Sequence, residues 1–405
     1  MAYNAEKTLP RTAASIFAQS YGDWVWYLVD NGSTDSTGKI IHELAKRDHR
    51  IVPLANKKNQ IWEPGNGITE VVEPYDDSDC ICWIDADDTY KPDFLKKSLA
   101  AMSENALDIV ACGNDFMDAL TNKLVGTRVL NQNLIIAGEG FSQNFIQYHQ
   151  FMRTYWAKLF SVAVLRRYDS TRVPTVFYGW DTLFTQEMFH NAFRIGILSE
   201  SMYQYYISQK SASYQWNVKR IDADRILYKA ARDFLFDKCG FVSTVNEEFL
   251  LLVYMNAIKD TLAVLLKSGK SDTEKLMGIL DIFSHADTKR LAAWKNLGTI
   301  FGDVAGMTRQ RTGLFAAAAK WLLLRKEVPD EQVERFCDVG QLVCAAAENA
   351  DGWVFFKKLR AQFWIGNGRT DKARAEVDEL AELLPADREI AGFQAQLNEP
   401  HPPRP

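Results

Sequence analysis

Two short apolar runs near the start of the chain end abruptly in acidic residues. The first covers residues 24–29 and is followed by Asp30, and the second covers residues 80–84 and is followed by Asp85-Ala86-Asp87-Asp88. Such near-continuous apolar runs are typical of strands that are covered on both faces, as in parallel sheets. Ligands of open parallel sheets bind at the carboxyl ends of the strands, so both acidic segments are expected at the ligand-binding edge.

The pattern of apolar residues changes near Trp216. Strand-like runs alternate with helical patterns before this residue, and only helical patterns follow it. The alternation predicts an α/β domain with a mostly parallel sheet over residues 1–216, followed by an all-helical domain over 217–349.

The elements of the first half follow from the spacing of its apolar residues. The pattern predicts a strand over residues 51–55 and a helix over 36–46 whose N-terminus is capped by Ser33 or Thr34. It also predicts a helix over 8–19 that buries one face, formed by Leu9, Ala13, Ile16 and Phe17.

The C-terminal part resembles a tetratricopeptide-type hairpin over residues 350–399. Predicted helices at 353–366 and 370–384 are joined by Asn367-Gly368-Arg369, and Ala373 and Ala375 are expected to pack against Ala361. The Pro-rich tail over residues 400–405 is expected to be disordered.

Composition excludes several classes of protein. Of the 405 residues, 47% are hydrophobic and 24% are charged, which are ordinary values for a globular protein. A net charge of -5 gives no overall attraction for nucleic acid. The six cysteines form no Cys-x-x-Cys pair, so we expect reduced thiols and no zinc. With no signal peptide and no membrane-spanning run in the sequence, we expect a cytoplasmic protein.

The second acidic segment has two readings. Three carboxylates within four residues repel one another unless a cation neutralises them, and a divalent ion with oxygen ligands suits this chemistry. Alternatively, Asp87 or Asp88 caps the helix that is expected after Pro92. The residues alone leave both readings open.

The order of the motifs resembles family 2 glycosyltransferases, which use nucleotide-sugar donors and have the GT-A fold, a Rossmann-like α/β domain. The resemblance covers about residues 1–216. It rests on segments that include Tyr3-Asn4, the stretch 29–37, Ile84 to Asp88, Trp156 to Phe160, and Asp181.

The resemblance implies a donor site made from both strand ends. Asp30 would hydrogen-bond the base of the nucleotide, usually uracil, and Tyr3 and Asn4 would line the same end of the pocket. Asp85 would face the ribose or a water of the metal, and Asp87 would coordinate Mn²⁺ or Mg²⁺ bridging the diphosphate. Asn66 stands in a loop where family members often have Arg-Asn before a Gly.

The resemblance also implies the reacting groups. Asp181 would be the general base that removes the proton of the acceptor hydroxyl, which implies inversion at the anomeric carbon; its alternative is a helix N-cap. Trp180 replaces the usual acidic residue and could stack on a sugar ring. Lys158 would contact acceptor or phosphate, unless Trp156 is a core aromatic and Lys158 a solvated lysine.

The resemblance therefore predicts an inverting, metal-dependent glycosyltransferase that moves a sugar from a nucleoside diphosphate to a hydroxyl of a cell-surface glycan or a lipid-linked acceptor. It implies UDP as the nucleoside diphosphate. The first strand of the family is absent before Tyr3, so we expect the natural reading frame to begin upstream. The alternative is a non-catalytic GT-A-like interaction protein. A nucleotidyltransferase would need a Gly-rich phosphate loop, which the sequence lacks. The helical half could shape the acceptor side, hold a protein partner or touch the inner face of the membrane.

Overall fold

The computed structural model describes residues 1–60, 68–207, 215–271, 330–346 and 350–398, together with scattered positions between 274 and 287. The chain divides into two compact units, Met1–Tyr254 and Met255–Pro405. Asn66, the helices expected over most of residues 272–325 and the tail over 400–405 lie outside the described residues.

The first unit combines strands and helices. Its strands are β1 (Trp26–Asp30), β2 (Ile51–Ala55), β3 (Cys80–Ile81), β4 (Thr89–Tyr90), β5 (Ile109–Asp118), β6 (Leu124–Arg128), β7 (Leu134–Ala137), β8 (Lys158–Ser161) and β9 (Arg194–Ile207). Its helices are α1 (Leu9–Phe17), α2 (Thr37–Arg47), α3 (Ile68–Val72), α4 (Phe94–Asn105), α5 (Gly140–Gln143), α6 (Phe145–Tyr148), η1 (His149–Met152), α7 (Val162–Leu165), η2 (Ser170–Arg172), α8 (Trp180–Asn191) and α9 (Lys219–Cys239). Helix α10 (Thr244–Lys267) contains the boundary between the units.

The strands of the described residues form two sheets. Strands β1 and β2 pair in parallel, and a second sheet has the order β3-β8-β5-β9-β4, with β6 beside β5 and β7 beside β9. Within the second sheet β5 and β9 are parallel, and the other pairs are antiparallel. The fold is therefore mixed α/β, and the expectation of a mostly parallel sheet is wrong for this sheet. Parallel neighbours need a long crossover, which the short turn between β5 and β6 does not provide.

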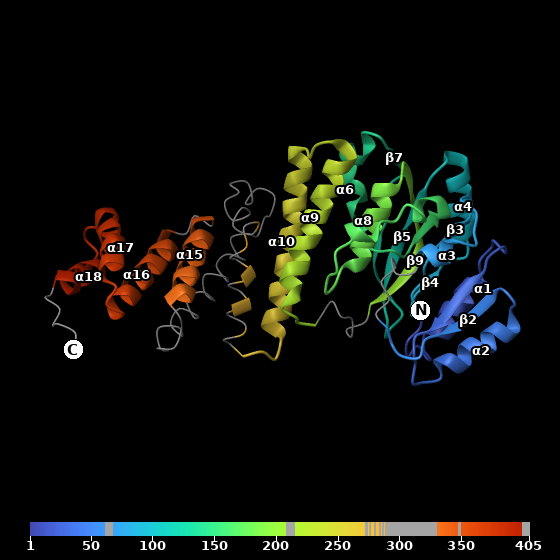
Figure 1. The fold of residues 1–405 in the computed structure, drawn as a ribbon, viewed down its shortest axis with the longest axis horizontal. Coiled ribbons are helices and arrows are strands. Elements are labelled where there is room, and N and C mark those ends of the chain that lie inside the picture. The colour runs from blue at the N-terminus through green and yellow to red at the C-terminus, as the bar shows by residue number, and fades with distance from the viewer. Residues whose placement is uncertain are drawn as a thin grey trace. The chain divides into compact units, whose positions relative to one another are not determined.

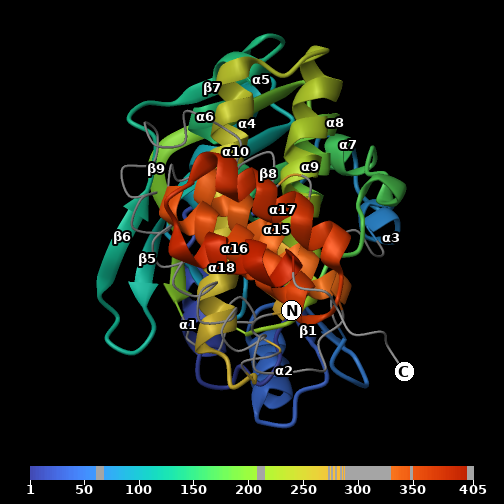
Figure 2. The same cartoon turned by 90° about the vertical axis from the view of Figure 1, so that its left-hand side faces the viewer.

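Helices cover both faces of the larger sheet. Figure 1 shows β5 and β9 between α4 on one side and α8 on the other, with α9 outside α8. Figure 2 shows α9 beside α8 from a second direction. Inside the sheet layer, the ring of Trp156 stacks on Tyr203 at 4.6 Å between centroids and on Tyr205 at 5.3 Å. These stacks join β9 to the segment that leads into β8.

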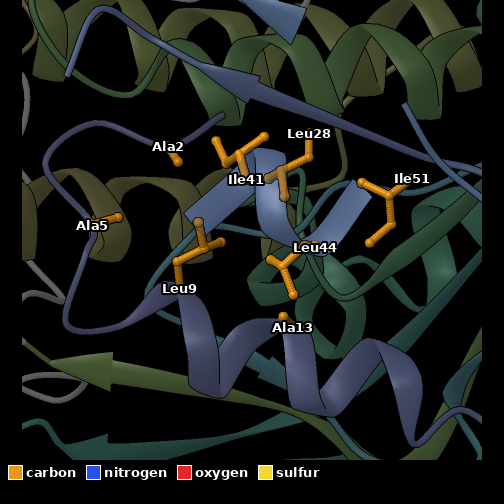
Figure 3. Packing of buried hydrophobic residues seen from close by; sticks show 8 residues of the cluster. All are labelled: Ala2, Ala5, Leu9, Ala13, Leu28, Ile41, Leu44 and Ile51. Atoms are coloured by element: carbon orange, nitrogen blue, oxygen red, sulfur yellow. The ribbon is translucent and has the colours of Figure 1, made fainter. Parts of the chain in front are cut away.

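A separate apolar cluster holds the first two helices against β1 and β2. Figure 3 shows its members, which are Ala2, Ala5, Leu9, Ala13, Leu28, Ile41, Leu44 and Ile51. The predicted apolar face of α1 is confirmed at Leu9, Ala13 and Ile16, which are buried. It is wrong at Phe17, which lies at the last turn of α1 and is 41% exposed.

The start of α2 is fixed by an aspartate that the sequence prediction did not choose. Asp35 accepts hydrogen bonds from the backbone N–H and the hydroxyl of Thr37, at 2.9 and 2.6 Å. Ser36 occupies the N-cap position without a side-chain bond. The expected cap by Ser33 or Thr34 is therefore wrong, because Ser33 and Thr34 bond to Asn4 instead.

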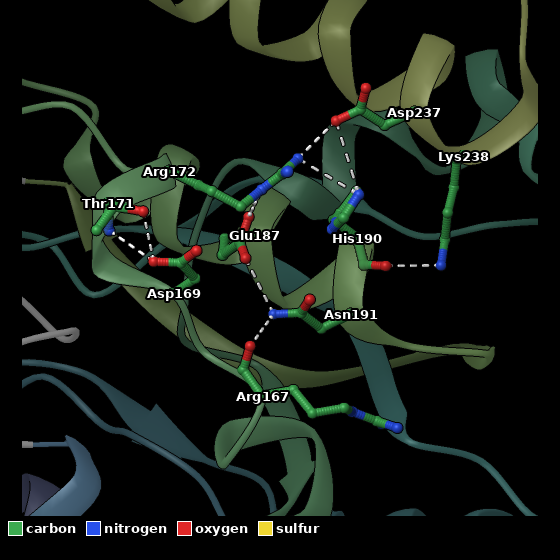
Figure 4. Close-up of polar contacts among 9 residues, drawn as sticks. All are labelled: Arg167, Asp169, Thr171, Arg172, Glu187, His190, Asn191, Asp237 and Lys238. Atoms are coloured by element: carbon green, nitrogen blue, oxygen red, sulfur yellow. Dashed lines mark hydrogen bonds and ion pairs between the residues drawn. The ribbon is translucent and has the colours of Figure 1, made fainter.

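A polar cluster joins α8 to α9 (Figure 4). Arg172 donates to the buried carboxylate of Glu187 at 3.1 Å and to Asp237 at 2.6 Å. Nε2 of His190 lies 3.7 Å from the same carboxylate of Asp237. Lys238 adds bonds to the carbonyl oxygens at the end of α8, 2.7 Å to that of His190. The two helices are thus held together by charge as well as by apolar packing.

The second unit contains α15 (Asp330–Ala346), α16 (Ala350–Gly366), α17 (Thr370–Leu383) and α18 (Arg388–Asn398). Ala361 and Ala373 lie in one buried cluster, as predicted for the hairpin, but Ala375 is exposed and that part of the prediction is wrong. Helix α18 was not predicted; its Ile390, Phe393 and Leu397 complete the same cluster.

Among the described residues, no helix combines the length and apolar character that crossing a membrane requires.

Candidate functional site

The acidic turn after β3 is anchored to β9 by its last residue. Asp88 is fully buried; its carboxylate accepts the hydroxyl of Tyr203 at 2.7 Å and the backbone N–H of Tyr206 at 2.8 Å. Asp93 occupies the N-cap of α4, without a side-chain cap bond. The capping reading of Asp87 and Asp88 is therefore wrong: Asp88 fixes the turn, and the turn presents Asp85 and Asp87.

Asp85 is held by an aromatic residue from another part of the chain. The hydroxyl of Tyr155 donates to Oδ1 of Asp85 at 2.5 Å. The ring of Tyr155 stacks on Trp180, with 5.4 Å between centroids and 22° between planes. Burial raises the pKa of Asp85, and the bond from Tyr155 opposes this rise.

Asp87 lies beside a cation from α1. Burial raises the pKa of Asp87, the charge of Asp85 raises it further, and the charge of Arg11 opposes both. Nη2 of Arg11 donates to the backbone carbonyl of Asp87 at 2.5 Å. Thr12, the next residue of α1, donates to the carbonyl of Asp88 at 2.8 Å. Helix α1 therefore fixes the backbone of the acidic turn.

Asp181 lies in the first turn of α8. Gly179 occupies the N-cap with a φ of 84°, and a Cβ there would meet Leu227 at 2.7 Å, so only glycine fits. Because the N-cap is Gly179, the capping reading of Asp181 is wrong. Its Oδ1 accepts the N–H of Thr182 at 2.9 Å.

The surroundings of Asp181 change its acidity. Burial raises the pKa of this carboxyl to about 6, and the charge of Asp85 adds to the rise. The N–H of Thr182 and the charges of Arg153 and Lys158 oppose it. The structure therefore brings the predicted base close to the first acid of the acidic turn, although 96 positions of sequence separate them.

Asp30 organises the loop that follows β1. Its Oδ1 accepts the N–H of Ser33 at 2.9 Å. A Cβ on Gly38 would lie 2.6 Å from Oδ2 of Asp30, so glycine at the start of α2 leaves room for this carboxylate. Asn4 joins the same loop, because its Oδ1 accepts the N–H of Thr34 at 2.9 Å. Tyr3 is 47% exposed beside it.

The two groups of predicted donor-site residues meet through the first residues of the chain. Ala2 pairs with Asp30: it donates to the carbonyl of Val29 and accepts the N–H of Asn31, both at 2.8 Å. Further along the same segment, Arg11 and Thr12 of α1 donate to the carbonyls of Asp87 and Asp88 in the acidic turn. The structure thus gathers Tyr3, Asn4, Asp30 and the acidic turn along one edge.

Lys158 and Trp156 lie inside the protein. Trp156 packs on the tyrosines of β9, as its core reading predicted. The reading of Lys158 as a solvated lysine is wrong: the residue is 2% exposed, and its Nζ donates to the carbonyls of Thr154 at 2.5 Å and Trp156 at 3.2 Å. Burial lowers the pKa of Lys158 to about 7. Its ammonium thus acts on Asp181 through electrostatics.

Sequence reasoning missed Tyr155 and Arg11. Tyr155 directly precedes the motif at Trp156 without being part of it, and Arg11 lies on the polar face of a helix that its apolar residues predict. The available signal was position: each of these residues sits next to a segment that carries the family resemblance.

The mixed sheet, with carboxylates after β1 and β3 and Asp181 in the first turn of α8, is an α/β domain of the GT-A class. Residues 1–168 match the family model described as glycosyl transferase family 2. Residues 1–168 are therefore similar to family 2 glycosyltransferases, and a helical C-terminal region follows the N-terminal domain.

Several known proteins are similar to parts of the chain. Glycosyltransferase GlyA of Streptococcus pneumoniae is 22% identical over 82% of this chain and 48% of its own length. WfgD of Escherichia coli, a UDP-Glc:alpha-D-GlcNAc-diphosphoundecaprenol beta-1,3-glucosyltransferase, is 25% identical over 33% of this chain and 49% of its own length. The chain thus spans about half the length of these curated relatives. The crystal structure of S. aureus TarS 1–349 with UDP aligns at 14% identity and a TM-score of 0.49, covering 90% of each chain.

Proposed function

We propose that this chain is an inverting, metal-dependent glycosyltransferase that transfers a sugar from a nucleoside diphosphate, UDP in the first instance, to a hydroxyl of a cell-surface glycan or lipid-linked acceptor. The observation that carries the proposal is that Tyr155 joins the two acidic segments: it bonds Asp85 and stacks on Trp180, the residue before Asp181. Burial, together with the charge of Asp85, raises the pKa of Asp181 to about 6. A carboxylate with this pKa is ionised at neutral pH and is a stronger base than an ordinary aspartate.

The chemical step is a single displacement. Asp181 takes the proton of the acceptor hydroxyl as its oxygen attacks the anomeric carbon, and the bond from that carbon to the diphosphate oxygen breaks. The nucleoside diphosphate leaves with the bonding electron pair. One base on the face opposite the leaving group gives inversion of configuration.

The carboxylates of the acidic turn suit a hard divalent cation. Asp87 does not cap helix α4, whose N-cap is Asp93. Burial and the like charge of Asp85 raise the pKa of Asp87, so a bound cation would reduce the repulsion between these two carboxylates. Mg²⁺ and Mn²⁺ need few protein carboxylates when a diphosphate supplies further oxygens. When bound, the ion would neutralise charge on the leaving group. Within the described residues, no three His, Cys, Asp or Glu side chains gather as a metal site. We assign Asp87 as the protein ligand and Asp85 as its neighbour because a diphosphate can supply the remaining oxygens.

The remaining residues would bind the nucleotide. Asp30 would accept the N–H of the base, with Tyr3 and Asn4 beside it, since Ala2 and the loop after β1 hold all three at one strand end. Asn66 lies outside the described residues, and its part in donor binding stays a prediction from the sequence. Trp180 would present its ring to the sugar, and Lys158 would act from within the protein by its charge near Asp181. The name of WfgD, which specifies a UDP-linked donor and a lipid-diphosphate acceptor, supports this choice of substrates.

Calorimetric titration with UDP and UDP-sugars, with and without Mn²⁺, tests the proposal. We expect binding that Mn²⁺ strengthens, loss of this strengthening in Asp87→Ala, and retained binding without sugar transfer in Asp181→Asn. Equal loss of binding in both variants would show that Asp181 is misassigned. Absence of binding to any nucleotide would favour the non-catalytic interaction protein.

A further inference from the structure

Arg11, in the first turn of α1, lies between the two ends of the proposed donor site. The residues before α1 include Tyr3 and Asn4, and Asn4 bonds the loop after β1, where the base is proposed to bind. At the other end, Nη2 of Arg11 donates to the backbone carbonyl of Asp87 at 2.5 Å. A nucleoside diphosphate has its base at one end and its phosphates at the other. A donor whose base lies at the loop after β1 would therefore bring its phosphates to the side of Arg11.

The guanidinium of Arg11 is fixed by an aromatic ring. Its central carbon lies over the ring of Tyr206, 3.4 Å from the centroid. Tyr206 is itself tied to the acidic turn, because its backbone N–H donates to Asp88 at 2.8 Å. Stacking of a guanidinium on an aromatic face is attractive and orients the cation. Because Arg11 is already ordered, little side-chain entropy would be lost when it binds an anion.

Part of this guanidinium is accessible to a ligand. Nη1 has no hydrogen-bond acceptor among the described residues, and it is not one of the buried polar atoms without a partner, whereas Nε of the same residue is. Arg11 as a whole is partly exposed. Nη1 therefore offers two N–H groups at the surface, on the same guanidinium that bonds the backbone of Asp87.

The charge of the acidic turn explains why a cation is needed here. Asp85 and Asp87 repel each other, and together with a diphosphate they carry more negative charge than one divalent ion neutralises. Arg11 bonds the backbone oxygen of Asp87 and not its carboxylate, so it adds positive charge and leaves the carboxylate for a metal ion. Guanidinium N–H groups form short, charge-assisted bonds to phosphate oxygens.

We propose that Arg11 binds the diphosphate of the donor through Nη1 and stabilises the nucleoside diphosphate as it leaves. This inference rests on the proposed function, which places the diphosphate at Asp87. Negative charge grows on the diphosphate oxygen as its bond to the anomeric carbon breaks. A cation that is fixed beside that oxygen beforehand lowers the barrier to this step. The guanidinium keeps all of its protons throughout, because arginine is not deprotonated in proteins.

Calorimetric titration of the full chain with uridine, UDP and inorganic pyrophosphate, each in EDTA and in Mn²⁺, tests the assignment. Arg11→Gln removes the charge and keeps an amide that can donate to the carbonyl of Asp87. We expect it to weaken the binding of UDP and pyrophosphate at least about tenfold in both conditions, a change of about 1.4 kcal/mol. The affinity for uridine should change less than about threefold, or about 0.6 kcal/mol.

Arg50→Gln is the matched control. Arg50 also lies over an aromatic ring, that of Trp24 at 3.8 Å, and also donates to a backbone carbonyl, that of Gly22 at 2.8 Å. It precedes β2, at the opposite end of the β1–β2 pair from Asp30. Its substitution should leave the affinities for all three ligands unchanged.

The comparison of EDTA with Mn²⁺ separates contact with the diphosphate from support of the turn. If Arg11 only fixed the backbone of the turn, Arg11→Gln would reduce the strengthening by Mn²⁺ and leave UDP binding in EDTA unchanged, and this result would overturn the proposal. Equal losses of uridine and UDP affinity would overturn it too, since uridine has no phosphate.

Pyrophosphate separates the failure of this inference from the failure of the proposed function. If wild-type protein binds no UDP, the proposed function fails. Loss of pyrophosphate binding in Arg11→Gln would then still support an anion site at Arg11. Retained pyrophosphate binding in the variant, or none in the wild type, would overturn that site as well.

Discussion

The pKa of Asp181 should determine the pH range over which the proposed sugar transfer takes place. A base must be ionised, so we expect kcat/KM to fall below an apparent pKa of about 6 and not near 3.8, the ordinary value. Asp85, Arg153 and Lys158 face this carboxyl, and the two cations lower its pKa. Lys158→Met should therefore move the acid limb to higher pH. Initial rates of sugar transfer between pH 4.5 and 8.5 measure both effects, and an acid limb that stays near pH 4 would contradict the assignment.

The same carboxyl costs stability at neutral pH. Its folded pKa lies above the unfolded value of 3.8, so the stability it contributes is present below about pH 4 and is lost as pH rises to about 6. Asp181→Asn removes the buried charge, and we expect it to raise the free energy of unfolding at pH 8 by about 1–3 kcal/mol, the value of one to two pKa units. Urea unfolding at pH 4 and pH 8 checks this, since at pH 4 the two proteins should be nearly equal.

Tyr155 contacts both the acidic turn, at Asp85, and Trp180, the residue before the proposed base Asp181. Tyr155→Phe removes the bond to Asp85 and keeps the stack on Trp180. We expect the affinity for UDP with Mn²⁺ to fall about tenfold, or about 1.4 kcal/mol, because Asp85 loses a charge-assisted bond. Tyr27→Phe, which removes the hydroxyl of an exposed Tyr27–Tyr75 pair, is the matched control. Equal affinities of the two variants would argue against the link.

Among the site residues, the sequence predicted those that belong to a motif. It missed those that reach the site only through tertiary contacts. Asp85, Asp87 and Asp181 could be found because each belongs to a motif of fixed spacing. Tyr155 and Arg11 could not, because their roles depend on contacts across 70 and 76 residues of sequence. Such contacts leave no periodic signal in the chain.

Among the elements, α8 matters most, because it carries Asp181, the proposed base, and is held by the polar cluster around Arg172. Arg172→Ala would leave the buried carboxylate of Glu187 without its cation and free Asp237 of α9. We expect a loss of about 1–3 kcal/mol in unfolding free energy, the usual cost of an unsatisfied buried group. Arg225→Ala removes an exposed pair and should cost less than about 1 kcal/mol. Chemical denaturation of both variants measures the difference, and equal losses would show that the cluster in Figure 4 does not brace α8.

Prediction of elements succeeded where amphipathic spacing is strong. Helices α1, α2 and α9 and strand β2 lie close to their predicted positions. The strand expected over residues 80–84 is shorter, because only Cys80 and Ile81 pair with β8. Trp83 instead packs edge-on against Phe160 and Phe184, so the apolar run there reflects side-chain packing. The direction of the strands was also predicted wrongly. An apolar run indicates that a strand is buried on both faces, but it does not indicate whether the neighbouring strand runs parallel or antiparallel.

For the whole molecule, the two compact units predict two unfolding steps. UDP with Mn²⁺ at 100 times its dissociation constant should stabilise the first unit by about 2.7 kcal/mol and leave the second unchanged. Differential scanning calorimetry with and without these ligands measures the shift. A single transition that moves as a whole would show that the units unfold together.

The anchoring of Asp88 to β9 has a consequence for how the protein is made. Asp88 and Tyr206 are separated by 118 positions, and their bond fixes the turn that carries Asp85 and Asp87. At about 5–20 residues per second, a ribosome needs roughly 6 to 24 s to travel between them. During that interval the acidic turn has been synthesised but lacks its partner strand. A nascent chain that ends before β9 therefore cannot yet bind donor, and nucleotide affinity appears only late in synthesis.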